Sequence, residues 1–169
     1  KTLMKMGVLE EYMFGDTKSN LLCHQVKGKY FNGTAYLDID PYLGMFERVQ
    51  QFFKESKSEE DVDTLRHAFY LKVGTQISVE EYNKGSENWK KETLIKMIKE
   101  WGWTAEKIDR VNQYADWQMM QKVELGNRIN KILMASYKNI SIKNKELDPS
   151  ESLITEKDTH LLGRKLFSF

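Results

Sequence analysis

Apolar residues recur every three or four positions through most of this chain, the spacing that gathers them on one face of an α-helix. Leu3, Met6, Leu9 and Met13 show this spacing and predict a short helix at residues 3–14. Further helices are predicted at residues 41–55, 58–74 and 78–85, with capping residues Asp40, Ser58 and Ser78 at their starts. The predicted fold class is therefore mainly α, and we expect a helical bundle.

The second half of the chain has the longest regular pattern. Apolar positions recur every four residues at about 86–101, and from 104 to 137 their mean spacing is about 3.6 residues, the α-helical repeat. Gly102 suits the left-handed residue that ends a helix, and Thr104 suits the cap of the next one. We predict a long αα-hairpin about Gly102, with one continuous helix at about 104–137 as its second arm.

Residues 22–39 carry a different pattern. Tyr30 and Phe31 favour strands, and Asn32 with Gly33 forms a common hairpin turn. This segment predicts either a short β-ribbon or an extended loop, and the pattern does not separate the two.

The chain divides by composition near residue 140. Residues 1–140 are expected to form a single helical domain, and residues 141–169 a C-terminal arm that begins polar and ends apolar. Because chain ends are usually polar and frayed, an apolar end is expected to dock on the core or on a partner. The candidate partner-binding residues are Tyr114, Trp117, Leu162, Leu166, Phe167 and Phe169.

Composition narrows the class of protein. Apolar residues make up 40% of the chain and charged residues 30%, which is typical of a folded globular protein. Cys23 is the only cysteine, so no intramolecular disulfide forms, and an intracellular, reducing compartment is expected. No apolar run approaches the ~20 residues of a membrane-spanning helix. The net charge is +1, but residues 86–145 carry 12 basic and 7 acidic side chains, an excess of +5.

Sequence motifs give little support for catalysis. The chain contains no dinucleotide fingerprint, Walker loop, HExxH, paired CxxC or nucleophile elbow, so we predict no catalytic residue, no metal ligand and no cofactor. One alternative is a magnesium or manganese site at Asp38 and Asp40, whose carboxylates share one side of an extended segment. Asp40 is also explained as a helix cap.

Two other clusters of reactive residues have simpler structural explanations. Cys23 and His24 could form a soft-metal site or a Cys/His catalytic set with His67 or His160. Adjacent residues of a strand point to opposite faces, however, so Cys23 and His24 do not converge on one site. The acidic residues near the start of the helix predicted at 58–74 compensate its dipole and lie on a solvated face. These residues are Glu59, Glu60, Asp61 and Asp63.

Residues 97–111 partly match a helix-turn-helix unit for DNA. Ile98 stands where that motif needs a small residue, and the following helix is too long for a recognition helix. Lys107 and Arg110 are basic, but neighbouring acidic side chains neutralise them. A plain αα-hairpin is the favoured interpretation.

The sequence therefore favours a non-enzymatic helical subunit or adaptor of a larger intracellular complex, acting through protein–protein contacts. The absence of catalytic motifs, the excess length of the 104–137 helix and the apolar C-terminus support this hypothesis. A metal-dependent enzyme with a site near Asp38 and Asp40, and a nucleic-acid-binding protein using residues 86–145, are the alternatives.

Overall fold

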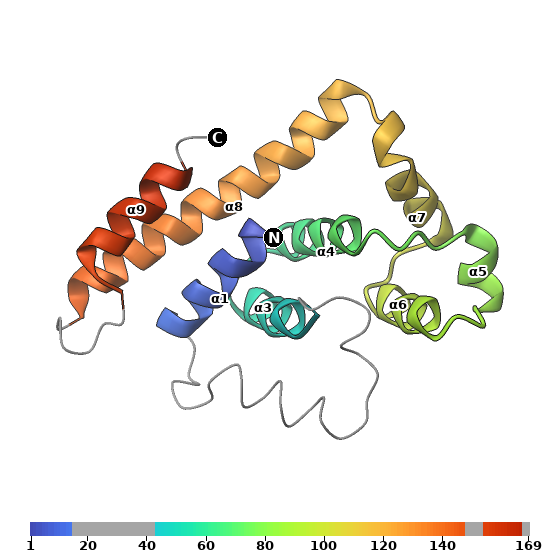
Figure 1. Cartoon of the computed structure of the whole chain (residues 1–169), viewed down its shortest axis with the longest axis horizontal. Coiled ribbons are helices and arrows are strands. Elements are labelled where there is room, and N and C mark those ends of the chain that lie inside the picture. The colour runs from blue at the N-terminus through green and yellow to red at the C-terminus, as the bar shows by residue number, and fades with distance from the viewer. Residues whose placement is uncertain (15–42, 148–153, 167–169) are drawn as a thin grey trace, which may run out of the picture.

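A computed structural model of the chain describes residues 1–14, 43–147 and 154–166. The described part is mainly helical and contains no strand, which confirms the predicted mainly α class and a helical bundle (Figure 1). The β-ribbon or loop predicted at 22–39 lies outside the described residues.

Eight α-helices and one 3-10 turn make up the described architecture. They are α1 (Thr2–Phe14), α3 (Leu43–Ser56), α4 (Glu59–Val73), α5 (Val79–Lys84), α6 (Trp89–Glu100), α7 (Ala105–Asn112), η2 (Gln113–Asp116), α8 (Met119–Glu146) and α9 (Glu156–Leu166). None of these helices is long and apolar enough to cross a membrane.

The predicted caps start the helices at the expected places. The hydroxyls of Ser58, Ser78 and Thr104 each accept a hydrogen bond from a backbone N–H in the first turn of α4, α5 and α7. Gly102 adopts a φ of +72°, the left-handed conformation predicted for it. Local chemistry therefore fixes where these helices begin.

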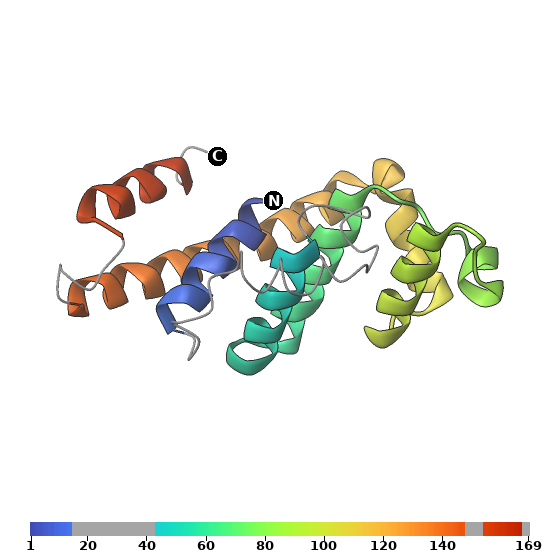
Figure 2. The ribbon, with the colours of Figure 1, turned by 60° about the horizontal axis from the view of Figure 1, so that its bottom comes forward.

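The core lies where α1, α3, α4 and α8 meet. Figures 1 and 2 show α8 running along the molecule, with α9 beside one end and α7 at the other. Phe46 of α3 stacks on Phe69 of α4 with ring centroids 4.0 Å apart, and Trp101 meets the Phe46 ring edge-on at 5.4 Å. These rings are a large part of the apolar surface that folding removes from water.

A buried polar cluster joins the first helix to the middle of α8. Glu10 is 1% exposed, and its carboxylate accepts hydrogen bonds from Lys57, Ser136 and Asn139 at 2.9, 2.5 and 2.8 Å. A buried carboxylate is tolerated only when it is paired in this way.

The prediction of one continuous helix at 104–137 is wrong. The chain leaves the helix after α7, passes through η2, becomes extended at Trp117 (φ −56°, ψ 139°), and restarts as α8. The Trp117 indole N–H donates to the Arg110 carbonyl at 2.6 Å, and Lys122 donates to the Ala115 carbonyl at 2.8 Å. These side chains satisfy backbone oxygens that a continuous helix would have bonded itself.

The helix α8 also continues beyond the predicted end, as far as Glu146. It passes through residue 140, and α9 packs beside it with Leu166 buried. The division into 1–140 and 141–169 stays a prediction.

Candidate functional site

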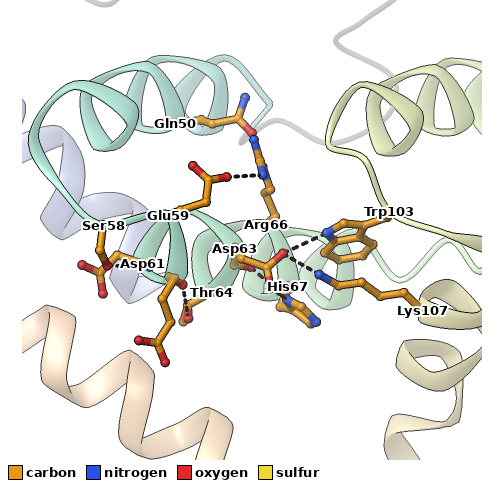
Figure 3. A network of polar contacts seen from close by, with 11 residues as sticks. Gln50, Ser58, Glu59, Asp61, Asp63, Thr64, Arg66, His67, Trp103 and Lys107 are labelled. Carbon is orange, nitrogen blue, oxygen red and sulfur yellow. Dashed lines mark hydrogen bonds and ion pairs between the residues drawn. The ribbon is translucent and has the colours of Figure 1, made fainter.

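A carboxylate on α4 is the centre of a polar network at the junction with α7. Asp63 Oδ1 accepts hydrogen bonds from Trp103 Nε1 at 3.0 Å and from Lys107 Nζ at 2.6 Å (Figure 3). His67, one helical turn further along α4, places Nδ1 3.3 Å from Asp63 Oδ2 and 2.8 Å from the Asp63 carbonyl oxygen. The network ties α4 to the segment that enters α7.

The electrostatics of this network favour ionised Asp63. Burial by itself would raise the pKa of Asp63, but hydrogen bonds from His67, Lys107 and Trp103, with the charge of His67, outweigh it. The pKa is held well below the ordinary carboxyl range. Asp63 is therefore a fixed negative charge that orients its cationic neighbours.

Aromatic packing makes the network rigid. Trp103 is 2% exposed, and its ring centroid lies 4.6 Å from that of His67. Lys107 Nζ lies 4.7 Å from the Trp103 ring centroid, within cation–π range. The ring and the carboxylate together fix the position of the lysine ammonium group.

A cleft with a volume of about 460 Å³ opens beside this network, between α4, α7 and the start of α8. His67, Lys107, Arg110 and Arg128 supply its basic groups, and Trp117 supplies an aromatic side chain. The chain breaks between α7 and α8, and the two helices run in different directions from that break (Figure 1). Both helices contribute residues to the lining of the cleft.

His67 lines the cleft, and one of its ring nitrogens is fixed by a hydrogen bond within α4. Its Nδ1 contacts a carbonyl oxygen, which only accepts, so Nδ1 carries a hydrogen and donates. The opposite nitrogen, Nε2, is on the side of the ring turned away from Asp63. His67 as a whole is 8% exposed, and it lines the cleft.

In the described part of the chain, the two arginines of the cleft do not stabilise the fold through ion pairs. Within the described part of the chain, neither Arg110 nor Arg128 forms a side-chain ion pair, and Arg110 is exposed. The Nε atom of Arg128 is buried and has no hydrogen-bond partner among the described residues. Both arginines line the cleft.

Two acidic side chains also line the cleft. The pKa of Glu106 is lowered because its carboxylate accepts hydrogen bonds from its own backbone N–H and from the Thr104 side chain. Glu106 is therefore engaged by the start of α7. Glu124 is exposed near the start of α8.

The structure brings together some of the residues singled out in the sequence. Trp117 lines the cleft, and its ring centroid lies 5.1 Å from that of Tyr114, which borders a separate cavity of about 220 Å³. Leu166 is buried, and Leu162 packs against the core. Their role in partner binding stays a prediction.

Several other candidates lie outside the described residues: Cys23, His24, Asp38, Asp40, Phe167 and Phe169. Within the described ranges, no three His, Cys, Asp or Glu side chains are arranged to hold a metal ion.

Sequence reasoning missed the residues that form this site. Asp63 was explained as part of an acidic helix start, and Lys107 and Arg110 as basic residues neutralised by neighbours. Asp63 and Lys107 are 44 positions apart, so only the tertiary fold brings them together. The isolated aspartate and lysine carry no motif that could have signalled the contact.

Comparison with known proteins gives a family match over the whole chain. Residues 1–169 match the family model described as adenylate cyclase, class-I, second domain. The adenylate cyclases of Salmonella typhimurium strain LT2 and Escherichia coli strain K12 are each 29% identical over 171 residues. That of Pasteurella multocida strain Pm70 is 28% identical over 170 residues.

The matches cover 99% of this chain and 20% of each of these three relatives, so the chain spans about a fifth of their length. No solved structure matches.

These matches overturn the function expected from the sequence. The relatives are named as enzymes and the family model is that of an enzyme domain, so the hypothesis of a non-enzymatic subunit or adaptor acting through protein–protein contacts is wrong. The absence of known catalytic motifs misled the interpretation, because a domain can belong to an enzyme without carrying any of those motifs.

Proposed function

This chain belongs to the family formed by the second domain of class-I adenylate cyclases, and we propose that it works as part of an adenylate cyclase, an enzyme that forms cyclic AMP from ATP. The observation that carries this proposal is the family match, which extends over residues 1–169 without a gap at either end. Relatives named adenylate cyclase cover 99% of the chain, which supports the same proposal.

The chemistry of the cleft is compatible with this function. ATP is a polyanion with an aromatic base, and the cleft combines Arg110, Arg128 and Lys107 with the indole of Trp117. Guanidinium groups suit phosphate oxygens, and indoles suit the face of a base. We also propose an intracellular location, since ATP is an intracellular metabolite and the chain has a single cysteine.

The test is the activity of the native protein that carries this sequence. Purified from its source and supplied with ATP and Mg²⁺, it is expected to form cyclic AMP and pyrophosphate, both measured by mass spectrometry. The same preparation given AMP in place of ATP is the control and should form none. A pure, folded protein that forms no cyclic AMP from ATP would overturn the proposal.

A further inference from the structure

We propose that the cleft between α4, α7 and α8 is a binding site for phosphate groups, held by the guanidinium groups of Arg110 and Arg128 and by His67. The site itself is inferred from the cleft alone. Only the choice of ATP as one carrier of the phosphates rests on the proposed function.

The first argument is the use of arginine in this chain. The chain contains five arginines among 26 basic residues. Arg48 forms an ion pair with Glu11 at 2.6 Å, and Arg66 forms one with Glu59 at 3.2 Å, so these two arginines are engaged within the folded protein. Arg110 and Arg128 instead line one cleft and, within the described ranges, bind no carboxylate. A planar guanidinium offers two parallel N–H donors to one phosphate, which a lysine does not.

The second argument is the buried Nε of Arg128. A buried donor without an acceptor is unfavourable, so native structures rarely retain one without a reason. This atom belongs to a residue that lines the cleft, and no acceptor for it exists among the described residues. A ligand oxygen in the cleft would satisfy it.

The third argument is the orientation of His67. Its Nδ1 donates to the Asp63 carbonyl oxygen, and the ring is fixed against Trp103. When the ring is protonated, Nε2 becomes a second donor. Because His67 lines the cleft, an anion bound there would lie beside an imidazole ring whose orientation is already fixed.

The local charge leaves room for an anion. Lys107 compensates Asp63 through a 2.6 Å ion pair, and Glu106 is engaged by the first turn of α7. Glu124 is exposed and lies four residues before Arg128 on α8, so its charge partly offsets that of Arg128. The cleft lining then carries three cationic side chains, Lys107, Arg110 and Arg128, against two carboxylates, Glu106 and Glu124.

The size of the cleft favours more than one phosphate group. At about 460 Å³ it lies within the range of small-molecule sites, roughly 300–1,000 Å³. A single phosphate would leave most of that volume unfilled. Pyrophosphate and the phosphate chain of ATP are the two sources that share the required chemistry.

Calorimetric titration of the 169-residue chain tests the site and separates the sources. Sodium pyrophosphate, ATP and adenosine are titrated in turn at the same ionic strength. Binding of pyrophosphate and ATP but not adenosine is expected. Binding of pyrophosphate alone also supports a phosphate site and assigns it to the free anion. Adenosine binding as tightly as ATP, or no binding of either phosphate compound, overturns the proposal.

A charge-matched pair of variants assigns the binding to this cleft. Arg110→Gln/Arg128→Gln removes both guanidinium groups, and Lys96→Gln/Lys138→Gln removes two exposed positive charges elsewhere. The arginine variant is expected to bind pyrophosphate at least about tenfold more weakly, and the lysine control within about twofold of the parent. Circular dichroism and thermal unfolding check that both variants fold.

Equal weakening in both variants would show that general charge, not this cleft, attracts the anion, and would overturn the proposal. Unchanged binding in the arginine variant would do the same. The readout is binding and not turnover, so a failed site leaves the cyclase proposal standing. An inactive native protein, conversely, leaves the measured phosphate site unaffected.

Discussion

Gly7 lies where α1 packs against α3. An added Cβ there would collide with Val49 Cγ1 and lie 3.3 Å from a ring carbon of Phe53. We predict that Gly7→Ala lowers the free energy of unfolding by about 1–3 kcal/mol, although alanine is the better helix former. Urea denaturation measures the change. Gly126→Ala in α8 meets no atom within 4 Å and should instead stabilise by up to about 1 kcal/mol. Similar effects in both variants would refute the packing argument.

The lowered pKa of Asp63 predicts how the free energy of unfolding changes in acid. Its pKa in the folded protein is lowered, because hydrogen bonds from His67, Lys107 and Trp103 outweigh the opposing effect of burial. The folded state therefore binds fewer protons than the unfolded state in acid. The stability that Asp63 contributes is present above its unfolded-state pKa of about 4 and is lost as the pH falls below it.

We predict that Asp63→Asn lowers the free energy of unfolding by roughly 1–3 kcal/mol at neutral pH, since it weakens two charge-assisted hydrogen bonds. The difference from the parent should narrow below about pH 4, because the unfolded parent then binds a proton at Asp63 that the folded parent does not. Urea denaturation across this pH range provides the measurement. A difference that stays constant with pH would contradict the role assigned to this carboxylate.

At the scale of the elements, the sequence predicts local features better than helix continuity. The starts of α4, α5 and α7 follow from Ser58, Ser78 and Thr104, because a cap acts within one turn. The break before α8 was missed because residues 113–118 contain no glycine or proline. The break depends instead on a side-chain hydrogen bond, in which the Trp117 indole N–H donates to the carbonyl of Arg110, seven residues earlier.

Replacing the indole tests that account of the break. Trp117→Phe keeps an aromatic ring but removes the N–H that donates to the Arg110 carbonyl, so we predict a loss of about 1 kcal/mol in the free energy of unfolding. Trp89→Phe is the matched control, because Trp89 is 41% exposed at the start of α6. That control should change by less than about 0.5 kcal/mol. Equal losses would mean that the indole bond does not stabilise the break.

At the scale of the whole molecule, the candidate cleft combines residues from α4, α7 and α8. Periodicity placed most helices, but it does not give the angle between two helices or the residues that meet across them. The pairing of Asp63 with Lys107 and the placement of Arg128 and His67 around one cleft depend on those angles. The match to the family extends over residues 1–169, and the proposed function rests on it.

At the same scale, hydrogen bonds join residues far apart in the chain, from Ser136 and Asn139 of α8 to Glu10 of α1. Glu10 and Lys57 have side chains only 2% and 9% exposed, so neutralising Glu10 leaves the lysine charge buried without a counter-charge. We predict that Glu10→Gln lowers the free energy of unfolding by roughly 3–5 kcal/mol, measured by urea denaturation.

An exposed ion pair provides the control for this prediction. Glu80 and Lys84 are 73% and 75% exposed, and Glu80→Gln should cost less than about 0.5 kcal/mol because water already solvates both groups. If the Glu10 and Glu80 variants lost the same stability, the Glu10 cluster would not be what fixes α1 onto α8. A large loss confined to Glu10→Gln would mean that the fold depends on closing this contact. The cleft would then depend on it indirectly, because α8 carries Arg128.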